Sequence, residues 1–169
     1  MTLTLTLGSR TVILPRRGFL PGLEGYDRRQ IRIDGGDATG EIAYSAAGTP
    51  ILDGPSVPNK HRWQISAYVT EELYWSLLAL YADHADRQRR FVANWQIGLA
   101  DEKARVVDFG PRTRAIVGGT TAAAVPGGGV AYFAVFQVAL GVPKGEPVNN
   151  PQYPWLVRFG LSELEVVTP

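Results

Sequence analysis

The chain has 169 residues, of which 45% are apolar and 20% charged, and its net charge is +1. This length suits one domain with a substantial core, and the composition excludes disordered and fibrous proteins. No long basic run occurs, so we expect no sequence-specific binding to nucleic acid. The absence of cysteine rules out disulfides and thiolate metal sites. The N-terminus lacks the pattern of a signal peptide and no apolar run reaches about 18 residues, so we expect no membrane as partner.

The first sixty residues predict short strands separated by turns. Residues 2–7 alternate Thr and Leu, which is the period of a strand with one buried face. Further strands are expected at residues 11–14, 26–33 and 41–44. The first strand carries no proline or lysine that would protect an edge, so we expect it to lie open for pairing with another subunit.

The stretch 60–97 predicts a strand, a helix and a second strand at 91–97. Residues 60–69 alternate, with His61, Trp63 and Ile65 on one face. Thr70 is a suitable N-cap, and we expect a helix from there to about Arg90. The apolar stripe of this helix should pack on a sheet that includes Trp63 and Ile65. The stripe consists of Tyr74, Leu77, Leu78, Tyr81 and Ala85.

The remaining residues again predict strands and loops. A hairpin loop is expected at 98–103 with a returning strand at 104–109, and the apolar run 130–140 predicts a buried central strand. Strands at 155–159 and 161–167 should close the chain. The expected fold class is mainly β, a β-sandwich or barrel with one flanking α-helix. We expect a single domain over residues 1–169, with long loops at about 15–25, 48–59, 118–129 and 141–154.

Two histidines are the first candidates for chemistry. A catalytic histidine needs an orienting acid and a nucleophile held in geometry, and no serine here lies in a nucleophile turn. We therefore expect structural roles for His61, on a strand face with Trp63, and for His84, late in the helix. We expect no catalytic residue, and the chain is predicted not to be an enzyme.

Metal and phosphate sites are also not expected. Asp34, Asp37 and Glu41 cluster with glycines, but their spacing is not that of a calcium loop. The glycine-rich segment 118–129 lacks the lysine and the strand–turn–helix context of a phosphate-binding loop. No cofactor is therefore predicted.

Charged and aromatic clusters have ordinary explanations. The helix carboxylates should form a solvated face; they are Glu71, Glu72, Asp83 and Asp86. The tryptophans could form a sugar-binding platform, but packing in the core and at subunit interfaces is the favoured role. They are Trp63, Trp75, Trp95 and Trp155.

A family resemblance arises from the helix and its flanking strands. A Trp-bearing strand ends in ISAYVTEE, continues into LYWSLLALYADH and is followed by Asn94-Trp95. Over residues 55–167 this order resembles the tail-tube-like proteins of tailed bacteriophages, which include tail tube, distal tail, minor tail and baseplate proteins. The loops 118–129 and 143–154 have no counterpart in this resemblance.

The resemblance implies a structural virion component that forms or caps a ring of the tail tube or baseplate. Its partners would be copies of itself in a ring and neighbouring tail tube or baseplate proteins, and it would assemble in the host cytoplasm into the phage tail. The alternative is a monomeric ligand-binding β module, similar to a carbohydrate-binding module, that uses Trp63 or Trp95. A ring protein predicts oligomers, whereas a binding module predicts a stable monomer with one aromatic groove.

Overall fold

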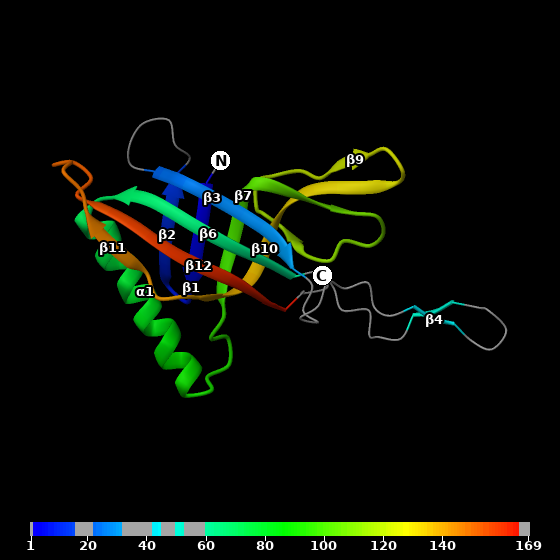
Figure 1. The fold of residues 1–169 in the computed structure, drawn as a ribbon, viewed down its shortest axis with the longest axis horizontal. Coiled ribbons are helices and arrows are strands. Elements are labelled where there is room, and N and C mark those ends of the chain that lie inside the picture. The colour runs from blue at the N-terminus through cyan, green and yellow to red at the C-terminus, as the bar shows by residue number, and fades with distance from the viewer. Residues whose placement is uncertain (1, 16–21, 32–41, 45–49, 53–59, 166–169) are drawn as a thin grey trace.

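The chain forms one large curled β-sheet with a single helix against it (Figure 1). The structure is a computed structural model, and it describes the chain except for residues 1, 16–21, 32–41, 45–49, 53–59 and 166–169. The strands are β1 (Thr2–Leu7), β2 (Arg10–Pro15), β3 (Gly22–Ile31), β4 (Ile42–Tyr44), β5 (Pro50–Leu52), β6 (Lys60–Val69), β7 (Ile97–Asp108), β8 (Ala115–Ile116), β9 (Ala123–Val125), β10 (Gly129–Leu140), β11 (Lys144–Pro147) and β12 (Trp155–Glu165). The helix is α1 (Glu71–Arg89). The expected class, mainly β with one helix, is confirmed.

The main sheet has the order β2-β1-β7-β10-β12-β6-β3, and its paired strands are antiparallel. The short strands β8 and β9 pair with β10, and β11 pairs with β12. The strands β4 and β5 pair with each other in a separate two-stranded antiparallel sheet. In the part of the chain that the structure describes, β2 and β3 therefore end the path of the main sheet.

The concave face of this sheet encloses the core. Side chains alternate between buried and exposed along β1, β6 and β10, as the period of a strand requires. The Leu side chains of β1 are buried and its Thr side chains face outward, so Thr and Leu lie on opposite faces as the alternation predicted. The largest fully buried side chains are Trp63, Tyr132, Phe136, Leu3, Leu5, Leu7, Leu14, Leu77, Leu80, Ile97, Leu99 and Leu161.

The helix begins and ends close to the predicted residues. Thr70 accepts a hydrogen bond at Oγ1 from the backbone N–H of Leu73 (3.3 Å), so it is the expected N-cap. The buried face of α1 agrees with the prediction at Leu77, and at Tyr74 and Tyr81, which pack partly buried against the core, but it is rotated at other positions. Its buried side chains are Leu77, Leu80 and His84, whereas Leu78 is only partly buried.

The position of α1 explains that difference. The helix packs on β2, β10 and β12 of the main sheet, which also contains β6 with Trp63 and Ile65, so the prediction that α1 covers this sheet is confirmed. Its buried leucines join the core formed by the concave face of the sheet. The neighbours of α1 come from distant parts of the chain, and a helical period cannot specify which of several adjacent faces such neighbours cover.

The predicted strand at 91–97 is wrong, because the chain makes a turn there. Phe91 and Asn94 have positive φ angles of 53° and 60°. The N–H groups of Phe91 and Val92 donate to carbonyls of the last helical turn, at Gln88 and Arg87. These residues therefore extend the helix end into a tight turn, and the next strand begins only at Ile97.

The predicted hairpin loop at 98–103 is also wrong. Residues 98–101 pair with both β1 and β10 inside the continuous strand β7. Asp101 lies within the segment expected to be a loop, but it follows Ile97 and Leu99 on the buried face of the strand. A carboxylate can occupy a buried strand position when other groups bind it, and the sequence order does not reveal such partners.

Several expected open segments are paired within the chain. The strand β1 is not an open edge, because it lies between β2 and β7. The expected loops at 118–129 and 141–154 contain β9 and β11, which pair with β10 and β12. Residues 22–25 of the loop expected at 15–25 belong to β3, and residues 50–52 of the loop expected at 48–59 form β5. The two expected C-terminal strands form one strand, β12, which continues through Gly160.

Candidate functional site

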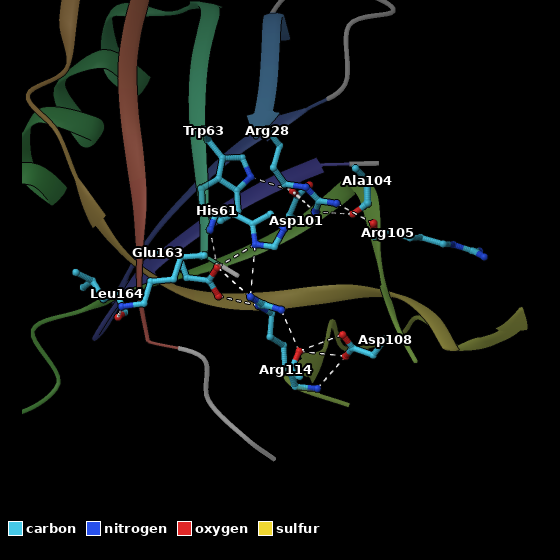
Figure 2. Close-up of polar contacts among 12 residues, drawn as sticks. Arg28, His61, Trp63, Asp101, Ala104, Arg105, Asp108, Arg114, Glu163 and Leu164 are labelled. Atoms are coloured by element: carbon cyan, nitrogen blue, oxygen red, sulfur yellow. Dashed lines mark hydrogen bonds and ion pairs between the residues drawn. The ribbon is translucent and has the colours of Figure 1, made fainter. Parts of the chain in front are cut away.

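One end of the enclosed core is polar, and it is the most unusual feature of the interior (Figure 2). The buried rows of β6, β7 and β12 are apolar near α1 and end in His61, Asp101 and Glu163. The exposed fractions of these three residues are 7%, 0% and 5%. We call this group, together with Arg28 and Arg114, the polar layer.

Asp101 gathers one half of the polar layer. Its Oδ2 accepts hydrogen bonds from the Tyr26 hydroxyl (2.6 Å), from Arg28 Nη1 (3.1 Å) and from Trp63 Nε1 (3.1 Å). Its Oδ1 accepts from the backbone N–H of Lys103 (2.8 Å). Burial, followed by the nearby Asp101 carboxylate, raises the pKa of the Tyr26 phenol, so this hydroxyl remains a donor.

Arg28 also closes a gap between distant strands. It lies on β3 and donates from Nη1 to the carbonyl of Ala104 (2.9 Å) and from Nη2 to that of Arg105 (2.7 Å). Neither Ala104 nor Arg105 has a paired residue in the ladders that β7 forms with β1 and β10. The guanidinium therefore satisfies backbone carbonyls that the sheet leaves unpaired, and it ties β3 to β7 across the open side of the sheet.

Glu163 gathers the other half. Arg114 binds its carboxylate with two nitrogens, Nε to Oε1 (2.7 Å) and Nη2 to Oε2 (3.1 Å). Oε2 also accepts from the backbone N–H of His61 (2.8 Å). Burial by itself raises the pKa of Glu163, but the hydrogen bonds and charges of His61 and Arg114 outweigh it and hold that pKa below its usual value.

His61 completes a carboxylate–imidazole pair. Its Nδ1 lies 2.9 Å from Glu163 Oε2, and because an ionised carboxylate only accepts, Nδ1 carries the proton. No residue that the structure describes forms a hydrogen bond with Nε2. In the neutral ring this nitrogen is therefore a free acceptor, as in a general base.

A third carboxylate lies beside the polar layer. Asp108 Oδ2 accepts from the Tyr132 hydroxyl (2.6 Å) and from the Thr113 backbone N–H (2.9 Å). Tyr132 accepts in turn from the Arg114 N–H (3.1 Å), and burial, followed by its bond to Asp108, raises the pKa of its phenol. This chain of contacts fixes the segment that carries Arg114, so the guanidinium is held in place before any ligand arrives.

A pocket of about 410 Å³ opens over the polar layer. Its lining combines charged groups, including Arg28, Arg105, Arg114 and Asp108, with the side chains of Val107 and Phe109. His61 contributes to the same wall. The arginines Arg28 and Arg114 point into a site where Asp101 and Glu163 already neutralise them.

The site consists of charged side chains that bind one another, together with one ring nitrogen, His61 Nε2, that has no hydrogen-bond partner among the described residues. Every buried side-chain polar atom of the described residues has a hydrogen-bond partner. No described serine or threonine hydroxyl is bonded to His61, and Thr113 is held by Asp108 and Arg114. A nucleophilic mechanism would need such a hydroxyl next to the base. The absence of catalysis remains a prediction.

The other predicted residues lie apart from this layer. His84 is buried between elements: its Nδ1 lies 3.0 Å from the Trp95 carbonyl, and its Nε2 accepts from the Leu140 N–H at 3.3 Å. It joins α1, the following turn and β10, which agrees with the structural role expected for it. Trp63 has no exposed surface and cannot form a sugar platform, whereas Trp75 is 57% exposed. Trp155 stacks on Tyr74, with ring centroids 4.7 Å apart.

The remaining candidates add no site in the described residues. Asp34, Asp37 and Glu41 lie outside them. Among the residues with described positions, no group of three or more potential metal ligands occurs. The helix carboxylates Asp83 and Asp86 pair with Arg87 and Arg89 of the same helix. Segment 118–129 forms a β-hairpin strand and its turn.

Sequence reasoning missed four members of the polar layer: Arg28, Asp101, Arg114 and Glu163. The strand period could have indicated two members of this layer. It places His61 on the same strand face as Trp63 and Ile65, and it places Glu163 on the same strand face as Leu161. Charged residues in phase with a buried row suggest paired burial. Their mutual pairing could not be read, because their separations along the chain reach 102 residues.

Comparison of this chain with protein-family models, with curated proteins and with solved structures finds no match. Among the described residues, no helix has the length and apolar character needed to cross a bilayer.

Proposed function

We propose that this chain is a structural subunit that assembles with copies of itself into a ring or tube, as a component of a phage tail. The observation that carries the proposal is Phe91, a large apolar side chain that is 93% exposed. Its backbone is held by hydrogen bonds in a defined turn, at a φ of 53° that is rare for a non-glycine residue. The adjacent Val92 is 42% exposed as well, so the two side chains present apolar surface together, and grouped exposed apolar surface favours a binding site for another protein.

The ends of the main sheet add support. The path of the main sheet ends in two different strands, β2 and β3, although its curl brings these strands into contact and α1 packs on β2. A contact between unlike surfaces of identical subunits is heterologous, and such contacts close into rings or continue as filaments. The sequence resemblance to tail-tube-like proteins directs the proposal to the phage tail, with neighbouring tube or baseplate proteins as further partners.

The polar layer is compatible with this role. A fully bonded set of ion pairs specifies one arrangement of strands more strictly than apolar packing does, at no gain in stability. A subunit that must present matching surfaces to its neighbours benefits from such a unique arrangement.

Size-exclusion chromatography with light scattering, followed by negative-stain electron microscopy, tests the proposal. We expect a mass that is a multiple of 18.4 kDa and that rises with protein concentration, together with ring-shaped or tubular particles. A monomer across the accessible concentration range, with no particles, would refute it.

The second candidate is a monomeric ligand-binding module, and the pocket over His61 favours it. The buried Trp63 does not support the aromatic platform expected for a carbohydrate-binding module. The pocket is polar in character, with His61 at its wall. A monomer that shows chemical-shift changes at His61 on titration with a sugar panel would favour this module.

A further inference from the structure

The two ends of α1 carry exposed aromatic residues in opposite electrostatic settings. At its start, Trp75 is 57% exposed and donates a hydrogen bond to Glu71 Oε1 (3.3 Å). Glu71 and Glu72 are exposed, and neither forms an ion pair with a residue that the structure describes. We call Glu71, Glu72 and Trp75 the acidic helix end.

At the other end, Phe91 and Val92 are 93% and 42% exposed, directly after Arg89 and Arg90. Four arginines surround this end, at positions 10, 87, 89 and 90, and within the part of the chain that the structure describes they pair with Asp83 and Asp86. Four positive charges less two negative charges leave a local balance of +2. We call Arg89, Arg90, Phe91 and Val92 the basic helix end.

The charge near the acidic helix end has the opposite sign. The strand β11 lies close to this part of α1, since Gly145 faces the Tyr74 ring. It adds Lys144 and the internally paired Glu146–Arg158. Two glutamates less one lysine give this end a local net charge of −1. The two helix ends therefore carry opposite net charges, and each also exposes apolar side chains.

We infer that the basic helix end of one copy docks on the acidic helix end of the next copy, with Phe91 and Val92 against Trp75. This inference rests on the proposed function and names its interface. The helix has 19 residues and is about 28 Å long at 1.5 Å per residue, so one chain cannot join its own two ends. The contact is heterologous and therefore repeats from copy to copy.

The turn at the basic helix end is suited to such a contact because it is anchored on both sides. The N–H groups of Arg90, Phe91 and Val92 bond to the last helical turn. After the turn, the carbonyl of Trp95 contacts His84 Nδ1, and the ring centroids of His84 and Trp95 lie 5.5 Å apart. Docking an already ordered turn costs less conformational entropy than docking a free loop.

Charge reversal tests the contact. Variant A carries Glu71→Lys and Glu72→Lys, and variant B carries Arg89→Glu and Arg90→Glu. Each variant alone presents like charges at both helix ends, so we expect its dissociation constant for self-assembly to rise at least about tenfold. A mixture of A and B, and one chain with all four substitutions, restores opposite charges and should assemble again. The control is Arg62→Glu with Arg112→Glu, which changes net charge as B does at exposed residues of β6 and of the segment after β7.

Cross-linking tests the geometry, because the chain contains no cysteine. Under mild oxidation, Trp75→Cys protein mixed with Phe91→Cys protein should give more disulfide dimer than either protein alone. Normal assembly of A and B alone, or a dominant Phe91→Cys homodimer, would overturn the inference and leave the proposed function standing. A wild-type protein that stays monomeric would overturn both.

Discussion

The two ends of the enclosed core are closed by different interactions, apolar packing at one end and buried ion pairs at the other. Near α1 the core is closed by Leu77 and Leu80, which pack without directional requirements. At the other end it is closed by Arg28, Arg114 and the carboxylates that bind them. Removing apolar atoms from a core lowers stability in proportion to the buried volume that is lost. Removing one partner of a buried ion pair instead leaves the other charge buried and unpaired, which costs more than the pair itself contributes. The polar end should therefore be the more cooperative and the less tolerant of change.

The largest expected effect is at Glu163. Replacing it with Leu leaves Arg114 buried without its main carboxylate, so we expect a loss of about 3–5 kcal/mol in the free energy of unfolding. Adding Arg114→Met should recover part of that loss, since it removes the unpaired buried cation. Urea denaturation of both variants measures this. Strictly additive losses would show that the two side chains do not act as a pair.

At the apolar end, Leu80→Ala should cost about 2–5 kcal/mol, because Leu80 is fully buried under the sheet. The matched control is Leu78→Ala on the same helix, where the side chain is only partly buried and the loss should be distinctly smaller. Denaturant midpoints of the two variants compare the faces directly. Equal losses would contradict the helix orientation described above.

A smaller effect is expected from Tyr26→Phe, which removes one donor to the buried Asp101 carboxylate but keeps Arg28 and Trp63 in place. Hydrogen bonds to charged groups contribute about 1.5–3 kcal/mol. Thermal unfolding monitored by circular dichroism measures the change. Tyr68→Phe is the control, because its hydroxyl bonds to Glu24 at an exposed position.

The two ends should also differ in their response to acid. The folded-state pKa of Glu163 is lowered, so its stabilising contribution is complete above the unfolded pKa of about 4.3 and disappears as the pH falls through the lower folded value. The stability gap between wild type and Glu163→Gln should therefore narrow below about pH 4. The gap between wild type and Leu80→Ala should not depend on pH in the same way. Denaturation at a series of pH values distinguishes the two behaviours.

The smallest effect on folding is expected outside both ends, at Phe91. Its side chain is almost fully exposed, so Phe91→Ala should change the stability of the monomer by less than about 0.5 kcal/mol. Reduced self-assembly together with unchanged stability would separate an interface role from a folding role. A large loss of stability would mean that this ring packs within its own chain.

Local chemistry in the sequence determined several elements closely. The alternation at residues 60–69 and the Thr70 cap predicted β6 and the start of α1, because both depend on neighbours within a few residues. The Thr–Leu alternation of residues 2–7 correctly predicted the strand β1 with Thr and Leu on opposite faces. The apolar run at 130–140 identified the central strand β10 for the same reason.

Only the tertiary structure decided which strands are neighbours and which charges are buried. The strand β1 was expected to be an open edge, but β7 covers it from nearly a hundred residues away. Asp101 lay in a segment expected to be a hairpin loop, yet Tyr26, Arg28 and Trp63 make a buried strand position tolerable for it. The physical reason is the same in both cases. Strand pairing and charge burial depend on partners brought together by folding, whereas a period or a cap depends only on the local chain.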